Sequence, residues 1–177
     1  MRFSTSLTVL LSLATTSLSA PINKRATASA AVLTVQTYDD FSVSSGVAGN
    51  ALAEVNAKFP IDTSNLAGVA ASDLAIISKA AQVSEDAETG TGGFNDAITA
   101  AGGTGTTAGT ALQNGKIKNK VLKLQTDVLR IQIEVAQGNT GSQSELAGQQ
   151  AKLATNVALD TAAAGQTSTA ISFSGSD

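Results

Sequence analysis

The sequence is poor in the residues on which most enzymes and metal proteins depend. Its 177 residues contain no cysteine, no histidine and no tryptophan, and only five phenylalanines and one tyrosine. Without cysteine there are no disulfides, so the fold depends on packing alone. Without histidine the chain lacks the commonest general base and metal ligand, and the few aromatic rings leave almost nothing to line the sugar cleft of a glycosidase. We therefore expect a protein that is not an enzyme and that needs no cofactor and no metal.

The first 25 residues carry signals for export and processing. Residues 1–19 show the basic start, short apolar run and small residues of a signal peptide, and the apolar run is too short to span a membrane. Residues 20–25 form a propeptide ending in Lys24-Arg25, a pair typical of kexin-type cleavage sites, although a simple charged flank remains the alternative. The mature chain, residues 26–177, keeps 8 basic against 14 acidic side chains, a net charge of −6. This charge argues against nucleic acid and anionic membranes as partners.

The longest run with a helical period lies at residues 116–137. Its apolar residues recur at spacings of four and three, which is the seam of a packed helix, and they are Ile117, Val121, Leu124, Val128, Ile131 and Val135. We expect the helix to begin near residues 106–108, because the lysines that start at Lys116 would otherwise face the positive end of the helix dipole. That start places Gly109 and Gly115 inside the helix. The lysines themselves are expected on a solvated edge.

A second apolar set, Leu122, Leu129 and Ile133, lies on another face of this helix, roughly 150° from the seam. Two interpretations are open. The helix is either buried on both sides, or this face is offered to a partner, a lipid or a hydrophobic surface. A narrow charged strip separates the two apolar faces and consists of Lys123, Asp127, Arg130 and Glu134.

Other segments predict further helices joined by glycine-rich turns. They span residues 39–58, 72–87, 94–101 and 142–164. Ser142 and Glu145 match the capping box that starts a helix. The chain as a whole predicts an all-α, antiparallel helical bundle of about four helices in a single domain. Its lead-in, residues 26–37, is expected to be either extended or the frayed start of a helix. Its tail, from about residue 166, is expected to be either flexible or a strap over the bundle.

Local clusters of acidic residues and glycines give no specific sign of a site. The densest acidic cluster contains Glu85, Asp86 and Glu88, and its spacing does not match a calcium-binding EF-hand loop. The glycine-rich residues 102–109 lack the lysine and hydroxyl residue that end a phosphate-binding loop. The acidic cluster is therefore interpreted as ordinary surface, and the glycine-rich stretch as a flexible joint between helices.

Two long stretches of the mature chain resemble a known group of proteins. They are VQTYDDFSVSSGVAGNALAEVNAKFP at residues 35–60 and GKIKNKVLKLQTDVLRIQIEVAQG at residues 115–138. Both resemble the cysteine-free small secreted proteins of filamentous ascomycete fungi, and the resemblance covers nearly all of residues 26–177. In size, export and helix content the chain is also similar to the fungal hydrophobic-surface-binding proteins, without a shared motif.

The resemblance implies an extracellular protein that is associated with the cell wall or the spore surface. Such proteins are described as conidial or wall components, or as host-directed effectors with a role in virulence. No catalytic residues come with the resemblance, and the partners it implies are fungal cell-wall polymers or a host protein. The alternative function is binding to a hydrophobic surface or a lipid through Leu122, Leu129 and Ile133.

Overall fold

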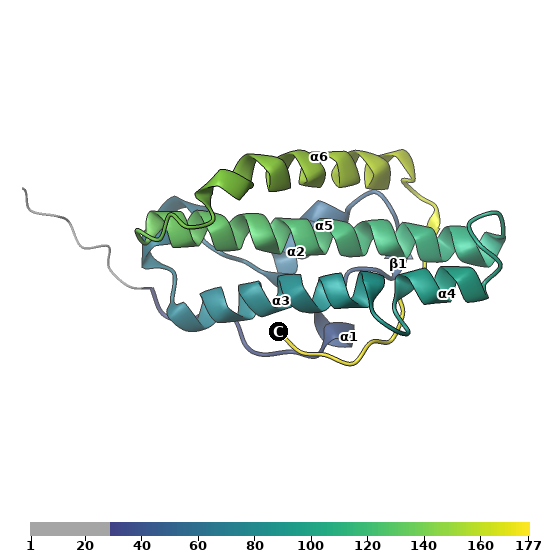
Figure 1. The fold of residues 1–177 in the computed structure, drawn as a ribbon, viewed down its shortest axis with the longest axis horizontal. Helices are drawn as coiled ribbons and strands as arrows, with labels where there is room; N and C mark the ends of the chain where they lie inside the picture. The colour runs from purple at the N-terminus through teal and green to yellow at the C-terminus, as the bar shows by residue number, and fades with distance from the viewer. Residues whose placement is uncertain (1–28) are drawn as a thin grey trace, which may run out of the picture.

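The computed structural model describes residues 29–177, which form a predominantly helical bundle (Figure 1). The predicted signal peptide, the propeptide and the Lys24-Arg25 pair lie outside the described residues. The structure confirms the predicted all-α bundle and adds one two-stranded sheet. In chain order the elements are α1 (Tyr38–Phe41), β1 (Gly46–Val47), α2 (Ala51–Lys58), η1 (Thr63–Gly68), α3 (Ala71–Thr89), α4 (Phe94–Ala100), α5 (Thr107–Ala136), η2 (Gln143–Glu145), α6 (Leu146–Ala162) and β2 (Thr167–Ser168).

The long helix α5 lies at the centre of the bundle, as its two apolar faces predict. It contacts α2, α3, α4 and α6, and Figure 1 shows α6 along one flank and α3 with α4 along the other. Thr106 caps the helix, because its hydroxyl oxygen accepts a 2.9 Å hydrogen bond from the N–H of Gly109. The predicted start near residues 106–108 is confirmed, and with it the placement of the lysines in the middle of the helix.

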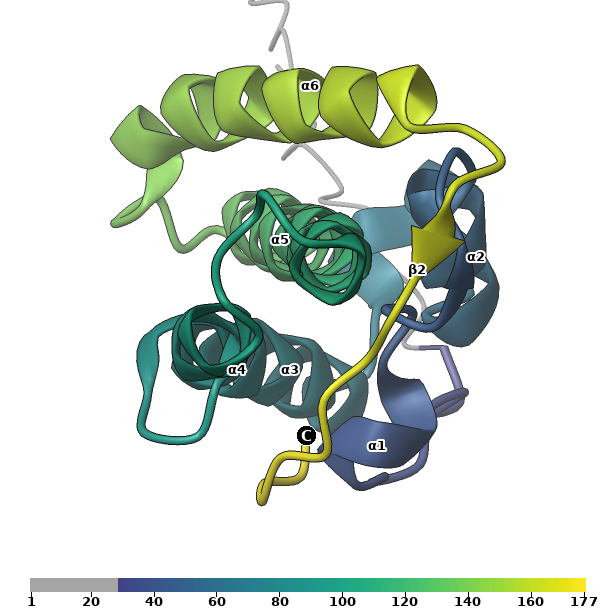
Figure 2. The ribbon, with the colours of Figure 1, turned by 90° about the vertical axis from the view of Figure 1, so that its right-hand side faces the viewer.

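Gly115 lies inside α5 because the C-terminal segment crosses the helix at that point. A side chain at Gly115 would collide with the carbonyl oxygen of Thr169, and the N–H of Thr169 donates to the carbonyl of Ala111 at 3.0 Å. Just before this crossing β2 pairs antiparallel with β1. Figure 2 shows the segment, in yellow, running from α6 across the bundle toward α1. The structure therefore has a strap, residues 163–177, where the sequence left a strap and a flexible tail as alternatives.

The core lies where α1, α2, α3 and α5 meet, and the strap helps to close it. Tyr38 and Phe41 of α1 are fully buried, with their ring centroids 5.5 Å apart in an edge-to-face arrangement. Phe59 packs on Phe41 at 6.1 Å, and Phe173 of the strap packs on Tyr38 at 5.9 Å. The few aromatic residues of the chain are thus used mainly to join the short N-terminal elements to the strap.

The helix predicted over residues 39–58 is wrong in its first half. The chain forms the short α1, then an extended stretch with β1, and only then α2. Gly46 and Gly49 have φ angles of +86° and +115°, which belong to the left-handed region and cannot continue a right-handed helix. The helices predicted over residues 72–87 and 94–101 are confirmed as α3 and α4.

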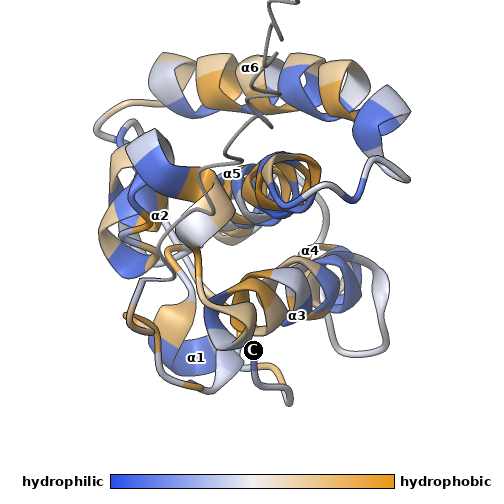
Figure 3. Cartoon of the chain, turned by 90° about the vertical axis from the view of Figure 1, so that its left-hand side faces the viewer, coloured by the Kyte–Doolittle hydropathy of each residue, from blue (hydrophilic) through white to orange (hydrophobic). Residues whose placement is uncertain are grey.

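The last helix begins later than its predicted capping box. A short 3-10 turn, η2, occupies the start of the predicted segment, and α6 begins at Leu146. The Ser142 side chain makes no capping hydrogen bond, and its hydroxyl oxygen instead accepts a 3.4 Å hydrogen bond from Arg130 of α5. Figure 3 shows hydrophobic and hydrophilic residues mixed along α6. Its inward side carries the buried Asn156 and Asp160, and Leu153 and Val157 are partly buried against the core cluster. The alanines expected to allow close packing, Ala147, Ala151, Ala154 and Ala158, are exposed instead.

Candidate binding site: a charged cleft beside α5

One long side of α5 carries no helix in front of it within the described residues. Figure 1 shows α6 and α3 flanking α5 on this side, and Figure 2 shows the same side uncovered between α6 and α3. A cleft of about 560 Å³ opens there between the three helices. We call it the charged cleft, and its lining comprises Ser78, Ala81, Gln82, Glu85, Lys123, Leu124, Asp127, Arg130, Gln149 and Lys152.

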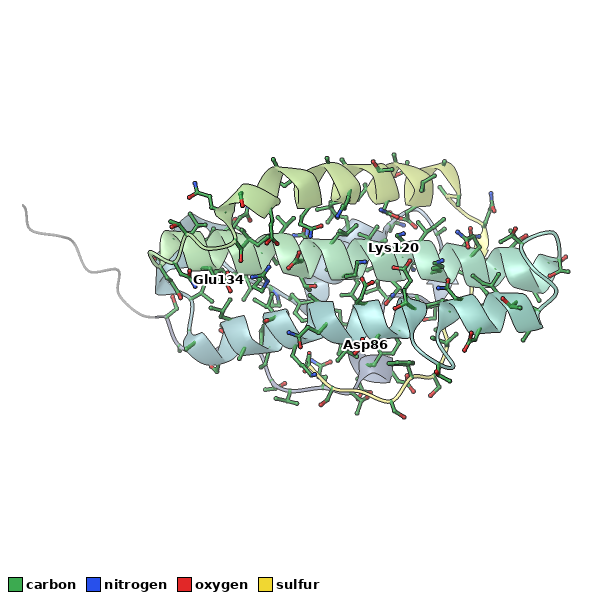
Figure 4. All side chains as sticks on the ribbon, viewed as in Figure 1. Asp86, Lys120 and Glu134 are labelled. Carbon is green, nitrogen blue, oxygen red and sulfur yellow. The ribbon has the colours of Figure 1, made fainter. Side chains whose placement is uncertain are left out.

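The charged strip predicted on α5 forms the floor and margins of this cleft. Its residues are only partly exposed, and the strip extends toward the helix start through Lys116 and Lys120. Lys120 and Glu134, both labelled in Figure 4, lie on the strip, while Asp86 belongs to the neighbouring α3. The strip thus separates the apolar faces of α5, as its spacing predicted.

Arg130 is held in a fixed position by two carboxylates of its own helix. Its guanidinium lies 2.8 Å from an oxygen of Asp127 and 2.9 Å from an oxygen of Glu134. Partial burial lowers the pKa of Arg130, but the hydrogen bonds and charges of the two carboxylates more than offset this effect, so its pKa is raised. The positive charge of Arg130 is therefore neutralised by the two carboxylates, and its side chain forms a fixed part of the cleft wall.

Lysines of the strip surround acidic residues at the end of α3. Glu88, which is only 7% exposed, lies 3.7 Å from Lys116, 3.3 Å from Lys120 and 3.5 Å from Lys123. Lys123 also forms a close ion pair with Glu85. One oxygen of Glu88 accepts no hydrogen bond within the described residues, so charge attraction rather than a directed bond holds it. These contacts give Glu85 and Glu88 of the acidic cluster a role in joining α3 to α5.

The cleft also contains polar side chains without partners. Among residues 29–177, no hydrogen bond or ion pair engages the side chains of Ser78, Gln82, Gln149 or Lys152. The Oε1 atom of Gln149 is buried and has no hydrogen-bond partner. Because this atom has almost no accessible surface, it lies beneath the cleft surface, and the groups that face the cleft are the hydroxyl of Ser78, the amide of Gln82 and the ammonium of Lys152.

Lys118 contradicts the expectation that all lysines of α5 lie on a solvated edge. Its side chain is fully buried, and its ammonium donates to the carbonyls of Ser45 at 2.9 Å and Val47 at 3.1 Å. It also forms a 2.8 Å ion pair with Glu54 of α2. The sequence did carry a signal for this role of Lys118, because Lys118 stands four residues before Leu122 and so lies on the second apolar face. Lys118 ties α2 and the stretch before it to α5.

The second apolar face of α5 belongs to the core. Leu122 and Ile133 are 0% exposed and Leu129 is 3% exposed, and all three pack in the main hydrophobic cluster. Their interpretation as a surface for a partner, a lipid or a hydrophobic material is therefore corrected to a core role. The physical reason is that α1, α2 and α3 cover this side of α5, which the sequence pattern of one helix could not reveal.

Aspartates outside the cleft hold the irregular segments in place. The buried carboxylate of Asp160 on α6 accepts hydrogen bonds from the N–H groups of Gly49 at 2.9 Å and Ala51 at 2.8 Å, at the start of α2. Asp73, also buried, accepts from the N–H groups of Val32 and Leu33, both at 3.0 Å. These carboxylates replace the missing regular hydrogen bonds of the backbone.

The strap is held by two further carboxylates. Asp39 accepts hydrogen bonds from the N–H of Phe173 at 3.0 Å and from the hydroxyl of Ser172 at 2.6 Å, and these bonds lower its pKa. The carboxylate of Asp177 accepts a 2.6 Å bond from the N–H of Gln36, and burial raises its pKa. The end of the chain therefore lies against the N-terminal segment.

The charged cleft has the size of a small-molecule site, and its lining is mostly polar. The chain has no histidine and no cysteine, so aspartate and glutamate are the side chains to consider as metal ligands. In residues 29–177 no three or more of them are grouped so that they could hold a metal ion. None of the helices in this part of the chain combines the length and the apolar character that crossing a membrane requires. The cleft volume falls within the roughly 300–1,000 Å³ of small-molecule sites.

Comparison with known proteins identifies a family and no activity. The family model described as a domain of unknown function (DUF8454) matches residues 33–172, which include every helix from α1 to α6 and the charged cleft. Searches of the curated proteins and of the solved structures returned no match.

Proposed function

The chain belongs to the DUF8454 family, and we propose that it is a secreted, non-catalytic protein that acts by binding, with the charged cleft as its binding site. The observation that carries this proposal is the cleft itself, because three helices form it and fixed ion pairs shape its wall. A preformed site of this kind loses little conformational freedom on binding. In this proposal the bundle serves as a rigid support.

Secretion is part of the proposal and rests on residues 1–25. The signal-peptide pattern and the Lys24-Arg25 pair support export followed by a second cut, giving a mature chain that starts at Ala26. The absence of cysteine from the sequence does not conflict with export, since the described fold is closed by packing, by buried carboxylates and by the strap. Mass spectrometry of the N-terminus of the secreted protein tests this step, and a mature chain beginning at Ala20 would contradict the second cut.

Two settings fit such a protein, the fungal wall or spore surface and a host target. The resemblance to cysteine-free small secreted fungal proteins supports both. Binding to hydrophobic material receives less support, because Leu122, Leu129 and Ile133 are in the core. The remaining large apolar side chains with high exposure are Val32 and Val35 before α1, Val47 in β1 and Leu159 in α6, so they are distributed over three different segments.

A partition experiment tests the proposal. Labelled mature protein is mixed with fungal wall, host tissue and hydrophobic beads, alongside the variant Ser78→Arg, which fills the cleft with a long side chain. The exposed neighbour provides the matched control, Lys79→Arg. We expect the parent and the control to be retained on wall or host tissue and Ser78→Arg to be lost from it, with an unchanged melting temperature.

The same experiment can overturn the proposal. Equal retention of Ser78→Arg and the parent would show that the cleft is not the binding site. Preferential retention of all three proteins on hydrophobic beads would favour the hydrophobic-surface function instead. Retention on wall alone or on host tissue alone would separate the two settings.

A further inference from the structure

The helix α6 buries fewer apolar side chains than α3. Only two of its 17 residues are buried, Asn156 and Asp160, and both are polar. Its inward apolar residues Leu153 and Val157 are only partly buried. The 19-residue α3 buries six apolar side chains, among them Ile77. Because burial of apolar surface is the main force that holds a helix on a bundle, α6 can separate from its neighbours at a smaller cost in free energy than α3.

The firm attachment of α6 lies near its C-terminal end. The carboxylate of Asp160 accepts hydrogen bonds from the N–H groups of Gly49 and Ala51 at the start of α2. Just beyond the helix, Ala164 approaches Gly49 so closely that a side chain at Gly49 would collide with it. The chain then continues into β2, which pairs with β1. We call these contacts the Asp160 anchor, and they hold the second half of the helix.

The N-terminal end of α6 has no comparable attachment. Within the described part of the chain, residues 140–159 form one hydrogen bond to another helix or strand, the 3.4 Å bond between Arg130 and Ser142. The joint from α5 to α6, residues 137–145, is exposed apart from the half-buried Ser142. The first half of α6, residues 146–153, is therefore held chiefly by partly buried side chains.

This half of α6 covers part of the apolar seam of α5. Leu124, Val128 and Ile131 of the seam are buried, yet they do not belong to the main hydrophobic cluster. Leu124 lines the charged cleft together with Gln149 of α6, and Figure 2 shows α6 on the side of α5 that lies away from α3. The Oε1 atom of Gln149 is buried without a hydrogen-bond partner. Outward movement of this half lets water reach that oxygen, which offsets part of the cost of exposing the seam.

We propose that the first half of α6 is a movable wall of the charged cleft, which swings away from α5 about the Asp160 anchor while the rest of the bundle stays folded. The movement carries Gln149 and Lys152 away from the α3 side of the cleft and so widens it. The opening follows from the packing of α6 alone. Its use in admitting a ligand rests on the proposed function, because it takes the cleft as the binding site.

Single thiols can report this opening, because the chain has no cysteine of its own. Val128→Cys places a thiol beneath the first half of α6. Val121→Cys makes the same change on the same seam, nearer the anchored end and within the main cluster. We expect an aromatic disulfide reagent to label Val128→Cys about a hundred-fold faster than Val121→Cys, at a temperature at which circular dichroism shows both variants folded. Equal labelling rates would show that only unfolding of the whole bundle exposes the seam, and would overturn the proposal.

Hydrogen exchange of the unmodified protein gives a second test that depends on no substitution. A detached helix of this length is marginal in water, so opening of the first half of α6 also breaks its internal hydrogen bonds. We expect the amides of residues 150–157, which bond to the carbonyls of the first half, to be protected about a hundred-fold less than those in the middle of α3. Equal protection of the two helices would contradict the opening.

The opening and the proposed function can fail separately. Soluble fragments of fungal wall or a host-tissue extract are added during labelling of Val128→Cys, and the double variant with Ser78→Arg is the control. If the cleft binds a component and α6 closes on it, labelling slows in Val128→Cys and not in the control. Fast labelling that neither material slows would leave the opening standing and refute its role in binding. Labelling as slow as in Val121→Cys, with loss of retention in Ser78→Arg, would leave the cleft as the binding site and refute the movable wall.

Discussion

The two sides of α5 both follow the period of a helix but have opposite chemistry. On the core side, Leu122, Leu129 and Ile133 are almost completely buried against the N-terminal elements and α3. On the cleft side, partly exposed charges such as Lys123 and Arg130 are paired with neighbouring carboxylates. Burial of apolar side chains stabilises a fold by kilocalories per residue, whereas exposed ion pairs contribute little. The difference indicates that the core side determines stability and leaves the cleft side available for binding.

The largest effect is expected from a charge placed on the core side. Leu129→Asp buries an unpaired carboxylate and should lower the free energy of unfolding by about 4 kcal/mol or more, enough to prevent cooperative folding. The matched change on the cleft side, Lys120→Gln, removes a partly exposed cation and should cost about 1 kcal/mol or less. Urea unfolding followed by circular dichroism measures both. Similar losses in the two variants would show that the two sides do not differ in this way.

The next effect concerns the buried cation on the core side. Lys118→Met keeps the apolar stem but leaves the carbonyls of Ser45 and Val47 without their donor. We expect a loss of about 2–4 kcal/mol, at the low end of buried pairs because the side chain of Glu54 is 38% exposed and can be solvated. In the double variant with Glu54→Gln the two losses should be less than additive. Full additivity would show that the ion pair has no energetic coupling.

A smaller effect is expected where α6 supports α2. Asp160→Ala removes the acceptor for the N–H groups of Gly49 and Ala51 and should cost about 1–2 kcal/mol. Asp160→Asn keeps one acceptor oxygen and should lose less. Thermal unfolding of both variants measures the difference. A loss in Asp160→Asn equal to that in Asp160→Ala would show that charge at the start of α2, rather than the hydrogen bonds, is what matters.

The smallest effect is a local dependence of the strap on pH. The pKa of Asp39 is lowered in the folded protein, so its contribution is present above the ordinary carboxyl pKa of about 3.9 and is lost as pH falls below it. Asp177 has a raised pKa and the opposite sign, because protonation relieves the cost of its burial. The protection of the Phe173 amide against hydrogen exchange, corrected for the intrinsic exchange rate at each pH, should therefore fall in acid in the parent, and Asp39→Asn should remove most of that pH dependence. A fall in protection of the same size in Asp39→Asn would contradict the assignment.

The sequence was sufficient for the elements whose signal is local. The heptad-like spacing and the lysine charges located α5 and its start, and the glycine-rich turns located the ends of α3 and α4. The role of Gly115 could not be predicted from the sequence, because it is the fold that brings the strap across α5 at this glycine. Ser142 and Glu145 matched a capping pattern, but the chain turns there to place Ser142 beside Arg130.

The site was only half predictable. The charged strip on α5 followed from periodicity, whereas the glutamines and Ser78 that complete the cleft come from α3 and α6 and have no distinctive pattern. The second apolar face was ambiguous, because one helix cannot show whether a neighbour covers it. The role of Lys118 was missed for the same reason, since its oxygen partners lie on segments about 70 residues away in sequence.

Mapping of chemical shifts tests the division between the two sides of α5 most directly. Backbone amide spectra of the isotope-labelled protein, residues 26–177, are recorded while soluble fragments of fungal wall or a host-tissue extract are added. The account predicts saturable shifts confined to the parts of α3, α5 and α6 around Gln82, Lys123 and Gln149, with the amides of Leu122 and Leu129 nearly unchanged. Shifts concentrated on the strap or spread through the core, or no shift with either probe, would contradict it.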